Sequence, residues 1–370
     1  MLFSAAGGHG HLQPLLPLAE LAVRAGHEVL VTGAASLSGH VAARGLAFAA
    51  TGPDLHPVRT PLAVHGTDEE RRVVARHFAG TLGRARATAV LDLCRAWRPH
   101  AVVRDEVDFG AAVAAEAARL PHVAVVVTGA GGFIVPELVR EPLEHLSSAF
   151  GVHAGGTALL NRHLTLTQFP ASFRHPEHPL PGRTLGYHTT PPPRAARPPG
   201  SRAAFVTLGT IFNTESGDLL RTAALGAARC PDLQQVIVAT GEHLDPDDLG
   251  ELPPHVVVRR FLSQDAALAR CDVVISHAGS GTVLGALKQA LPTVSLPMGA
   301  DQHLNAERLR ALGLGLTLRA DATDAEQVRV AVETALHSTT MRRSLETTRN
   351  EVLALPSADH ALQAIADLVP

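Results

Sequence analysis

The stretch LFSAAGGHGHLQPLLPLAELAVRAGHEVLV (residues 2–31) decides the fold class. It begins with a short apolar run at residues 2–5, which predicts a strand, and a glycine-rich turn follows. Leucines then recur at helical spacing over residues 13–25, with a proline near the first turn and Gly26 at the end, as helix start and stop signals require. A second apolar run at residues 28–31 completes a β-α-β unit, which predicts a parallel sheet covered by helices.

The same alternation of apolar runs and helical periodicity continues along the chain. In the first half, further strands are predicted at residues 101–104, 122–127 and 164–167. In the second half, strands are predicted at residues 203–208, 235–239, 256–259, 273–276, 293–296 and 315–318, and helices at 217–230, 280–290, 302–312 and 324–336. Between the halves lies GYHTTPPPRAARPPG (residues 186–200), whose prolines can join neither a central strand nor a helix. We therefore expect two α/β domains, residues 1–185 and 201–350, joined by a stiff linker.

Length and composition exclude several classes of protein. With 370 residues, 46% of them hydrophobic and 18% charged, the chain can bury two cores and is not expected to be disordered. The net charge of -3 gives no electrostatic footprint for nucleic acid, and no apolar run reaches the ~18 residues of a membrane-spanning helix. The cysteines are too few for a disulfide framework or a zinc cage. These features predict a cytoplasmic protein, monomeric or homodimeric, without nucleic-acid or integral membrane association.

The most informative motif is ISHAGSGT (residues 275–282). A strand that ends in a glycine-rich turn and opens a helix presents free backbone N–H groups and the positive end of the helix dipole, which suits a diphosphate. Ser280 and Thr282 add hydroxyl donors, and His277 is expected to donate a charge-assisted hydrogen bond. This turn is therefore a candidate diphosphate site.

A second motif, LPMGADQHLN (residues 296–305), follows the next predicted strand. It places Asp301 and Gln302 just ahead of a helix. A carboxylate and an amide together can bind the hydroxyl groups of a sugar, each of which both donates and accepts a hydrogen bond. The two motifs in combination predict a binding site for a nucleotide sugar.

The glycine loop GGHGHLQP (residues 7–14) offers a catalytic base. Transfer of a sugar with inversion requires a base that takes the proton of the attacking hydroxyl. A histidine at a helix N-terminus suits this role, because the helix dipole disfavours the imidazolium and keeps the ring neutral. A carboxylate is then expected on the far ring nitrogen. Asp105, directly after the strand at residues 101–104, is the best placed candidate, and Glu106 is its nearest rival.

These motifs together resemble a known family. HAGSGT (residues 277–282), PxxxDQ (297–302) and NAER (305–308) look like the nucleotide-sugar signature of the bacterial natural-product and plant glycosyltransferases of the GT-B fold. The resemblance extends over nearly the whole chain. It implies two Rossmann-like domains facing a central cleft, an acceptor-binding first domain and a nucleotide-sugar-binding second domain. It also implies that a last helix, within residues 351–370, crosses back to the first domain.

The resemblance assigns roles to individual residues. By it, the diphosphate is held by Thr210, His277, Gly279, Ser280, Gly281 and Thr282, the donor sugar by Asp301 and Gln302, and the nucleobase by Phe261 and Leu262. The family's Gly-His-x-x-Pro pattern matches His11, which would be the base, and Asp105 would be its partner. Where the family has an aromatic-x-Pro-Gln segment, this chain has FLSQ (residues 261–264), so the loop lacks the proline. A buried core position is the alternative interpretation of Phe261.

The expected activity is transfer of a sugar or deoxysugar from a TDP- or UDP-sugar to a hydroxyl of an apolar natural-product aglycone, with TDP favoured and without a cofactor or metal. A sugar-nucleotide epimerase, a lipid-linked sugar transferase and a non-catalytic partner protein are the alternatives. His9 and His11 could instead indicate a metal site, but no carboxylate cluster accompanies them in the sequence. Residues 51–80 and 129–156 fit the strand-helix alternation poorly, and they are assigned to the acceptor pocket, with surface loops as the alternative.

Overall fold

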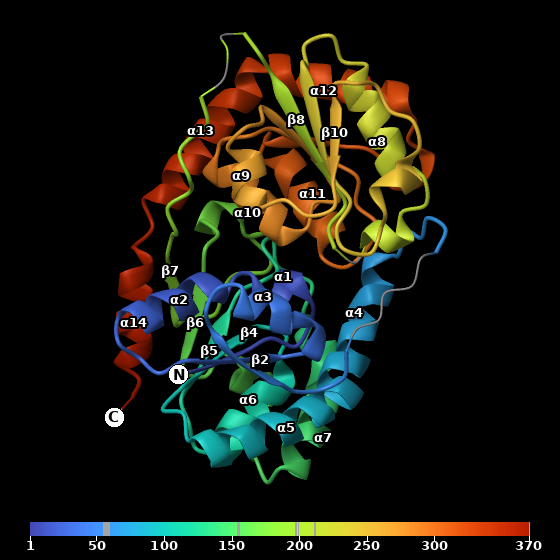
Figure 1. The fold of residues 1–370 in the computed structure, drawn as a ribbon. Coiled ribbons are helices and arrows are strands. Elements are labelled where there is room, and N and C mark those ends of the chain that lie inside the picture. The colour runs from blue at the N-terminus through green and yellow to red at the C-terminus, as the bar shows by residue number, and fades with distance from the viewer. Residues whose placement is uncertain (55–59, 154–155, 197, 199, 211, 370) are drawn as a thin grey trace.

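The protein folds into two parallel sheets, each covered by helices on both faces. The structure is a computed structural model that describes residues 1–54, 60–153, 156–196, 198, 200–210 and 212–369. The two sheets belong to the two halves of the chain, and the halves lie one above the other in Figure 1. This arrangement confirms the α/β class and the two Rossmann-like units that the sequence predicts.

The first sheet, within the described residues, has seven strands in the order β3-β2-β1-β4-β5-β6-β7, all parallel. Its strands are β1 (Leu2–Ser4), β2 (Leu30–Gly33), β3 (Ala47–Ala50), β4 (Val102–Asp105), β5 (His122–Val125), β6 (Leu164–Thr167) and β7 (Thr184–Gly186). Its helices are α1 (His9–Leu12), α2 (Leu16–Arg24), α3 (Ser38–Ala42), α4 (Thr67–Arg76), α5 (Leu82–Trp97), α6 (Phe109–Ala117) and α7 (Pro136–Ala149). Alternate residues of β1 and β4 enter separate cores on the two faces, as a parallel sheet covered on both sides requires.

The second sheet, in the part of the chain that the structure describes, has six parallel strands in the order β10-β9-β8-β11-β12-β13. Its strands are β8 (Ala203–Thr207), β9 (Gln235–Ala239), β10 (Val256–Arg259), β11 (Val273–Ser276), β12 (Thr293–Ser295) and β13 (Gly315–Thr317). Its helices are α8 (Leu219–Ala228), α9 (Gln264–Leu268), α10 (Ser280–Lys288), α11 (Gln302–Ala311), α12 (Ala325–His337) and α13 (Thr339–Leu353). These strands agree with the predicted ones to within one residue at each end.

The chain crosses between the two domains twice, and the crossings run side by side (Figure 1). The linker after β7 pairs with the turn after α13, where the backbone N–H of His188 donates to the carbonyl of Pro356 at 2.8 Å. The last helix, α14 (Ala358–Ala366), packs its Leu362 and Ile365 into the core of the first domain beside α2. The linker residues 197 and 199 lie outside the described part. Within that part, none of the helices combines the length and apolar character needed to cross a bilayer.

The structure corrects the sequence prediction at several elements. Among the predicted strands, β2 begins two residues later than expected and β5 ends two residues earlier. The helix expected at residues 13–25 begins only at Leu16, as α2, and a separate four-residue helix, α1, precedes the predicted range. Pro17 occupies the first turn of α2, where a missing N–H costs nothing. The strands β3 and β7 were not predicted. Both contain only three or four residues, and β3 is alanine-rich and half exposed, so neither gives a distinct apolar run.

Two insertions of the first domain reach the second domain. Residues 60–65 donate backbone hydrogen bonds across the gap: Thr60 to the carbonyl of Thr214 at 2.8 Å, and Ala63 to that of Glu215 at 3.0 Å. The description of these residues as a free surface loop is therefore wrong, although residues 55–59 lie outside the described part. In the second insertion the backbone N–H of Gly129 donates to Ser280 Oγ of the second domain at 2.7 Å. Within the first domain α7 of this insertion packs against α4 and α6, and residues 154–155 are likewise not described.

Candidate active site

The candidate site residues lie at the point where the strand order of each sheet reverses. In the first sheet the chain moves outward from β1 to β2 and β3 and then returns to β4, on the other side of β1. The second sheet repeats this arrangement, with β8 and β11 as the central pair. At such a point the loops after neighbouring strands diverge and leave a crevice at the carboxyl ends of the strands. His11 follows β1 and Asp105 ends β4, whereas Thr210 and His277 follow β8 and β11.

His11 and Asp105 form a close pair. The Nδ1 atom of His11 lies 3.4 Å from Oδ1 of Asp105, and the carboxylate is fully buried whereas 28% of the histidine side chain is exposed. The backbone N–H of Ala6 donates to Oδ2 at 2.7 Å and that of Val107 to Oδ1 at 2.8 Å, so the carboxylate is fixed in place. The Nδ1 side of the ring thus faces a buried negative charge, which leaves Nε2 for a substrate proton.

Two further residues shape the position of the His11 ring. Its face stacks on Phe78, with the ring centroids 6.0 Å apart and the planes at 15°. Its other side lies against Gly7, where the ring occupies the space that a Cβ atom would need. Only glycine fits there. No sequence pattern pointed to Phe78, because it approaches His11 from an insertion nearly 70 positions away in the chain.

The electrostatic environment of His11 differs from the prediction that the helix dipole keeps it neutral. Burial of the ring is the largest single effect and opposes protonation, but the nearby carboxylates, Asp105 foremost, together outweigh it and raise the pKa of His11 above its usual value. Asp301 and Glu106 add to the increase. The helix itself is short, because α1 contains only four residues. The carboxylates therefore decide the charge state.

Glu106, the rival partner, is engaged elsewhere. Its Oε1 atom accepts hydrogen bonds from the backbone N–H of Val127 at 2.8 Å and from the N–H and hydroxyl of Thr128 at 2.6 and 2.7 Å. It therefore anchors the loop after β5. Asp105 is the carboxylate that lies next to His11.

His277 is buried under the turn that opens α10. Its ring lies against Gly279 and Gly209, and a Cβ atom on Gly209 would come within 2.7 Å of Nε2. Burial lowers the pKa of His277 to about 4, and the Thr207 backbone offsets this only in part. The ring is therefore neutral at neutral pH in the ligand-free protein. A neutral ring can still donate an N–H to a bound diphosphate, and that bond is charge-assisted because the acceptor is ionised, so the expected bond stays a prediction.

A hydrogen-bonded network joins the two motifs of the second domain to the first domain. The hydroxyl of Ser280 donates to Oδ2 of Asp301 at 2.6 Å, and the amide of Asn305 donates to the same oxygen at 2.8 Å. From the first domain, the backbone N–H of Gly129 donates to Ser280 Oγ at 2.7 Å and that of Ala130 to Asn305 Oδ1 at 3.0 Å. Asn305 was part of a quoted motif but was not predicted as a site residue. It holds Asp301, Ser280 and the first domain together.

Burial of Asp301 raises the pKa of its carboxyl group, although Ser280 and Asn305 partly oppose the increase.

The turns before Ser280 and Asp301 both contain an alanine in the left-handed region, Ala278 at φ 62° and Ala300 at φ 50°. A non-glycine residue there costs about 1–3 kcal/mol, and such strain is typical of functional sites.

The remaining predicted residues fall into two groups. Gln302 and Thr282 bond to protein: Gln302 Oε1 accepts from the Met298 N–H at 2.8 Å, and the Thr282 hydroxyl donates to Gln264 at 3.0 Å. The other predicted positions follow the strands β8, β10 and β11 of the second domain. Gly281 is exposed in the first turn of α10, Thr210 is half-buried after β8, and Leu262 is half-buried and packs on the core.

Phe261 is 65% exposed, so the alternative of a buried core aromatic is wrong. Its ring lies 6.2 Å from the His40 ring of the first domain.

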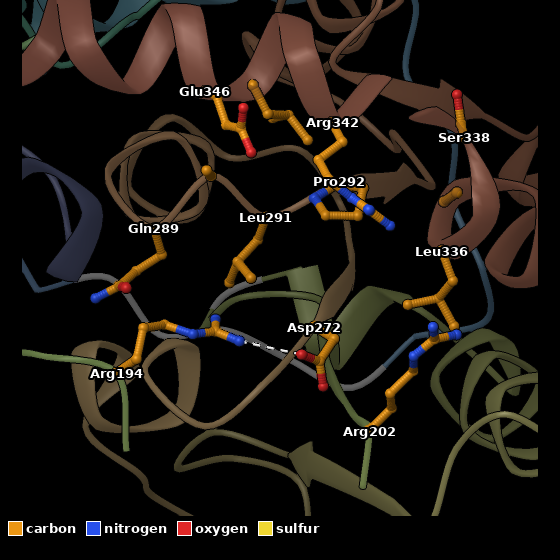
Figure 2. Close-up of a pocket in the computed structure, with 13 residues that line it drawn as sticks. Arg194, Arg202, Asp272, Gln289, Leu291, Pro292, Leu336, Ser338, Arg342 and Glu346 are labelled. Carbon is orange, nitrogen blue, oxygen red and sulfur yellow. Dashed lines mark hydrogen bonds and ion pairs between the residues drawn. The ribbon is translucent and has the colours of Figure 1, made fainter. Parts of the chain in front are cut away.

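The described surface also has a groove of about 340 Å³ between the linker, α12 and α13, where Arg194 pairs with Asp272 at 3.1 Å (Figure 2). It contains none of the predicted site residues, so the candidate site is separate from it.

Comparison with solved structures places this fold. Spinosyn rhamnosyltransferase SpnG, solved in complex with thymidine diphosphate and with spinosyn aglycone, superposes over 99% of both chains with TM-scores of 0.80 and 0.78 at 22% identity. Glycosyltransferase SnogD from Streptomyces nogalater superposes over 100% of this chain and 99% of its own, with a TM-score of 0.76 at 25% identity. The fold is therefore that of the GT-B glycosyltransferases.

Sequence relatives identify the family. Residues 225–368 match the family described as erythromycin biosynthesis protein CIII-like, C-terminal domain. Elloramycin glycosyltransferase ElmGT of Streptomyces olivaceus is 30% identical over 355 residues, 85% of each chain. L-demethylnoviosyl transferase of Streptomyces niveus is 29% identical over 342 residues, 90% of this chain and 88% of its own. The chain belongs to this family of natural-product glycosyltransferases from antibiotic pathways.

Proposed function

We propose that the protein transfers a deoxysugar from a TDP-sugar to a hydroxyl of an apolar natural-product aglycone, with inversion at the anomeric carbon. The observation that carries the proposal is the His11–Asp105 pair at the switch point of the first sheet. The Asp301 carboxylate of the second domain contributes to the raised pKa of the same histidine, which supports a site shared by the candidate base and the candidate sugar-binding residues.

Each group of residues has a role in this reaction. Nε2 of His11 takes the proton of the acceptor hydroxyl as its oxygen attacks the anomeric carbon. The bond from that carbon to the diphosphate oxygen breaks, and the nucleoside diphosphate leaves on the opposite face. Asp105 stabilises the imidazolium that forms. The N–H groups at the start of α10 and the His277 ring stabilise the charge that develops on the diphosphate.

The choice of donor and acceptor rests on the relatives. Several are named for transfer of deoxysugars, such as the tylactone mycaminosyltransferase of Streptomyces fradiae, and SpnG was solved with thymidine diphosphate and with its aglycone. On this basis a TDP-linked deoxysugar is favoured over a UDP-sugar, and Asp301 with Gln302 would bind the hydroxyls that the deoxysugar retains.

A screen of donors and acceptors tests this function. The purified protein is incubated with TDP- and UDP-linked sugars and with polyketide aglycones, and products are followed by mass spectrometry. We expect glycosylated aglycone and free TDP, with an anomeric configuration in the product, measured by NMR, opposite to that of the donor. Conversion of the nucleotide sugar to an epimer without an acceptor would refute transfer, and retained configuration would refute inversion.

A variant of His277 tests the diphosphate site. Loss of a hydrogen bond to a charged group costs about 1.5–3 kcal/mol, which corresponds to roughly 10- to 100-fold weaker binding. We expect this loss in TDP affinity for His277→Ala by titration calorimetry, and a smaller loss for His277→Gln, which keeps an N–H donor. His255→Ala is the matched control, because that ring bonds to the carbonyl of Ala228. Equal affinity in the His277 and His255 variants would remove His277 from the site.

A further inference from the structure

A cluster of two histidines and one carboxylate spans the two domains outside the proposed catalytic pair. His9 begins α1, His40 lies in α3, and Glu242 follows β9 in the second domain. Each residue offers one ligand atom, and the three atoms all lie within 4.8 Å of one another. The cluster thus draws its ligands from both sides of the gap between the domains.

The distances suit ligands of a single ion. Nε2 of His40 lies 3.0 Å from Oε1 of Glu242. Ligands bound at 2.0–2.1 Å in a tetrahedral site lie about 3.3 Å apart, close to this separation. The rings of His9 and His40 meet edge to face, with centroids 3.5 Å apart, so the two imidazoles are in direct contact.

The chemistry of His9 also favours a metal. Among the described residues, its Nε2 atom is buried without a hydrogen-bond partner. A ring nitrogen of this kind is a typical zinc ligand, and Arg44 is a nearby positive charge. Arg44 itself pairs with Glu20 at 2.7 Å, so its charge is largely engaged away from the cluster.

The structure offers two comparison clusters of the same residue types. Glu116, His122 and His163 form one, but Arg162 pairs with Glu116 at 2.7 Å, and the buried Arg104 acts on His122, so positive charge opposes a cation there. The other, at His175, Glu177 and His178, comes from a single short surface segment. Among the clusters found in the described residues, the one of His9, His40 and Glu242 is the one that draws its ligands from both domains.

We propose that His9, His40 and Glu242 bind a zinc ion that bridges the two domains. Two imidazoles and one carboxylate form a ligand set that Zn²⁺ accepts, with a fourth position left for water. An ion held by ligands from both domains favours the arrangement in which the domains are close. Zinc would therefore regulate domain opening. The proposal does not depend on the sugar chemistry, because its readout is metal binding.

The test uses the full chain, freed of metal with EDTA and titrated calorimetrically with Zn²⁺ alone. We expect one site in the wild type, and at least about 10-fold weaker binding in both His40→Gln and Glu242→Gln. These substitutions keep the side-chain size of each ligand or close to it, and thermal melts without metal check that the variants fold. His178→Gln, in the single-segment surface cluster, is the matched control and should bind as the wild type does.

The zinc affinities of the wild type, His40→Gln and Glu242→Gln together test whether the ion bridges the domains. Binding that is equal in the wild type and in both ligand variants would overturn the site. Weaker binding in His40→Gln with unchanged binding in Glu242→Gln would show an ion held by the first domain alone, which overturns the bridge. As a second readout, Zn²⁺ should raise the melting temperature of the wild type and leave that of Glu242→Gln nearly unchanged.

Discussion

Replacement of His11 by alanine is expected to lower the rate of sugar transfer by about 10²–10⁴-fold, the usual contribution of a positioned general base. TDP binding should stay nearly unchanged, because the candidate diphosphate residues belong to the second domain and the variant removes only a ring of the first. The comparison is made with single-turnover rates and with calorimetric titration of TDP. A variant that keeps most of its turnover would show that His11 is not the base.

The pH dependence of transfer tests the same role more finely. A base must be unprotonated to act, so the rate should fall as the pH drops through the pKa of His11, which the Asp105 carboxylate raises above its usual value. In Asp105→Asn this limb should move to lower pH, because the negative charge is gone, while the maximal rate also decreases. Glu106→Gln is the control and should move the limb less, since that carboxylate is bound to Val127 and Thr128. A larger shift in Glu106→Gln would make Glu106 the partner.

Much of the fold could be predicted from local sequence. Central strands of a parallel sheet are buried on both faces and form continuous apolar runs, and those of the second domain, such as VVIS in β11, were found to within one residue. Edge strands lack this signal. β3 reads AFAA and is half exposed, and β7 has only three residues, so both went unrecognised. Their pairing with β2 and β6 is a property of the assembled sheet.

The candidate site, too, could be predicted from the sequence only in part. His277 and Asp301 could be proposed because each lies in a motif a few residues long. Their environment could not, because the pKa of His277 depends on burial and that of Asp301 on packing against distant residues. The contacts between the two domains could not be predicted from the sequence either. The N–H of Gly129 meets Ser280 across 151 positions, and nothing in the sequence around either residue marks the contact.

A buried ion pair below the candidate active site provides the second large expected effect. Arg86 in α5 is 1% exposed, and its guanidinium donates to both carboxylate oxygens of the fully buried Asp108 at 2.7–3.1 Å. It also donates to Ser4 Oγ at 2.7 Å and to the carbonyl and hydroxyl of Thr51 at 3.0 Å. Burial would raise the pKa of Asp108, but Arg86 holds it below its usual value, so the carboxylate stays charged. The pair thus joins β1, α6 and the start of the first insertion.

Arg86→Met should lower the free energy of unfolding of the first domain by about 3–5 kcal/mol at neutral pH, because it leaves the Asp108 carboxylate buried without its cation. Trp97, the single tryptophan of the chain, is the last residue of the same helix. Its fluorescence therefore reports the urea-induced unfolding of this domain. Arg95→Met, also in α5, is the matched control. Its pair with Asp92 is about 70% exposed on each side, and such pairs contribute about 0–1 kcal/mol.

The sign of the pH dependence distinguishes an ion pair from a packing effect. The lowered pKa of Asp108 contributes stability that is present above the carboxyl's unfolded-state pKa and is lost as the pH falls through its folded-state pKa. The difference between wild type and Arg86→Met should therefore be largest near neutral pH and shrink under acid conditions, where Asp108 becomes protonated. Asp108→Asn in the Arg86→Met background should recover part of the loss by removing the unpaired charge. If the loss in Arg86→Met is the same at neutral and acid pH, or no larger than in Arg95→Met, the ion pair does not stabilise the first domain.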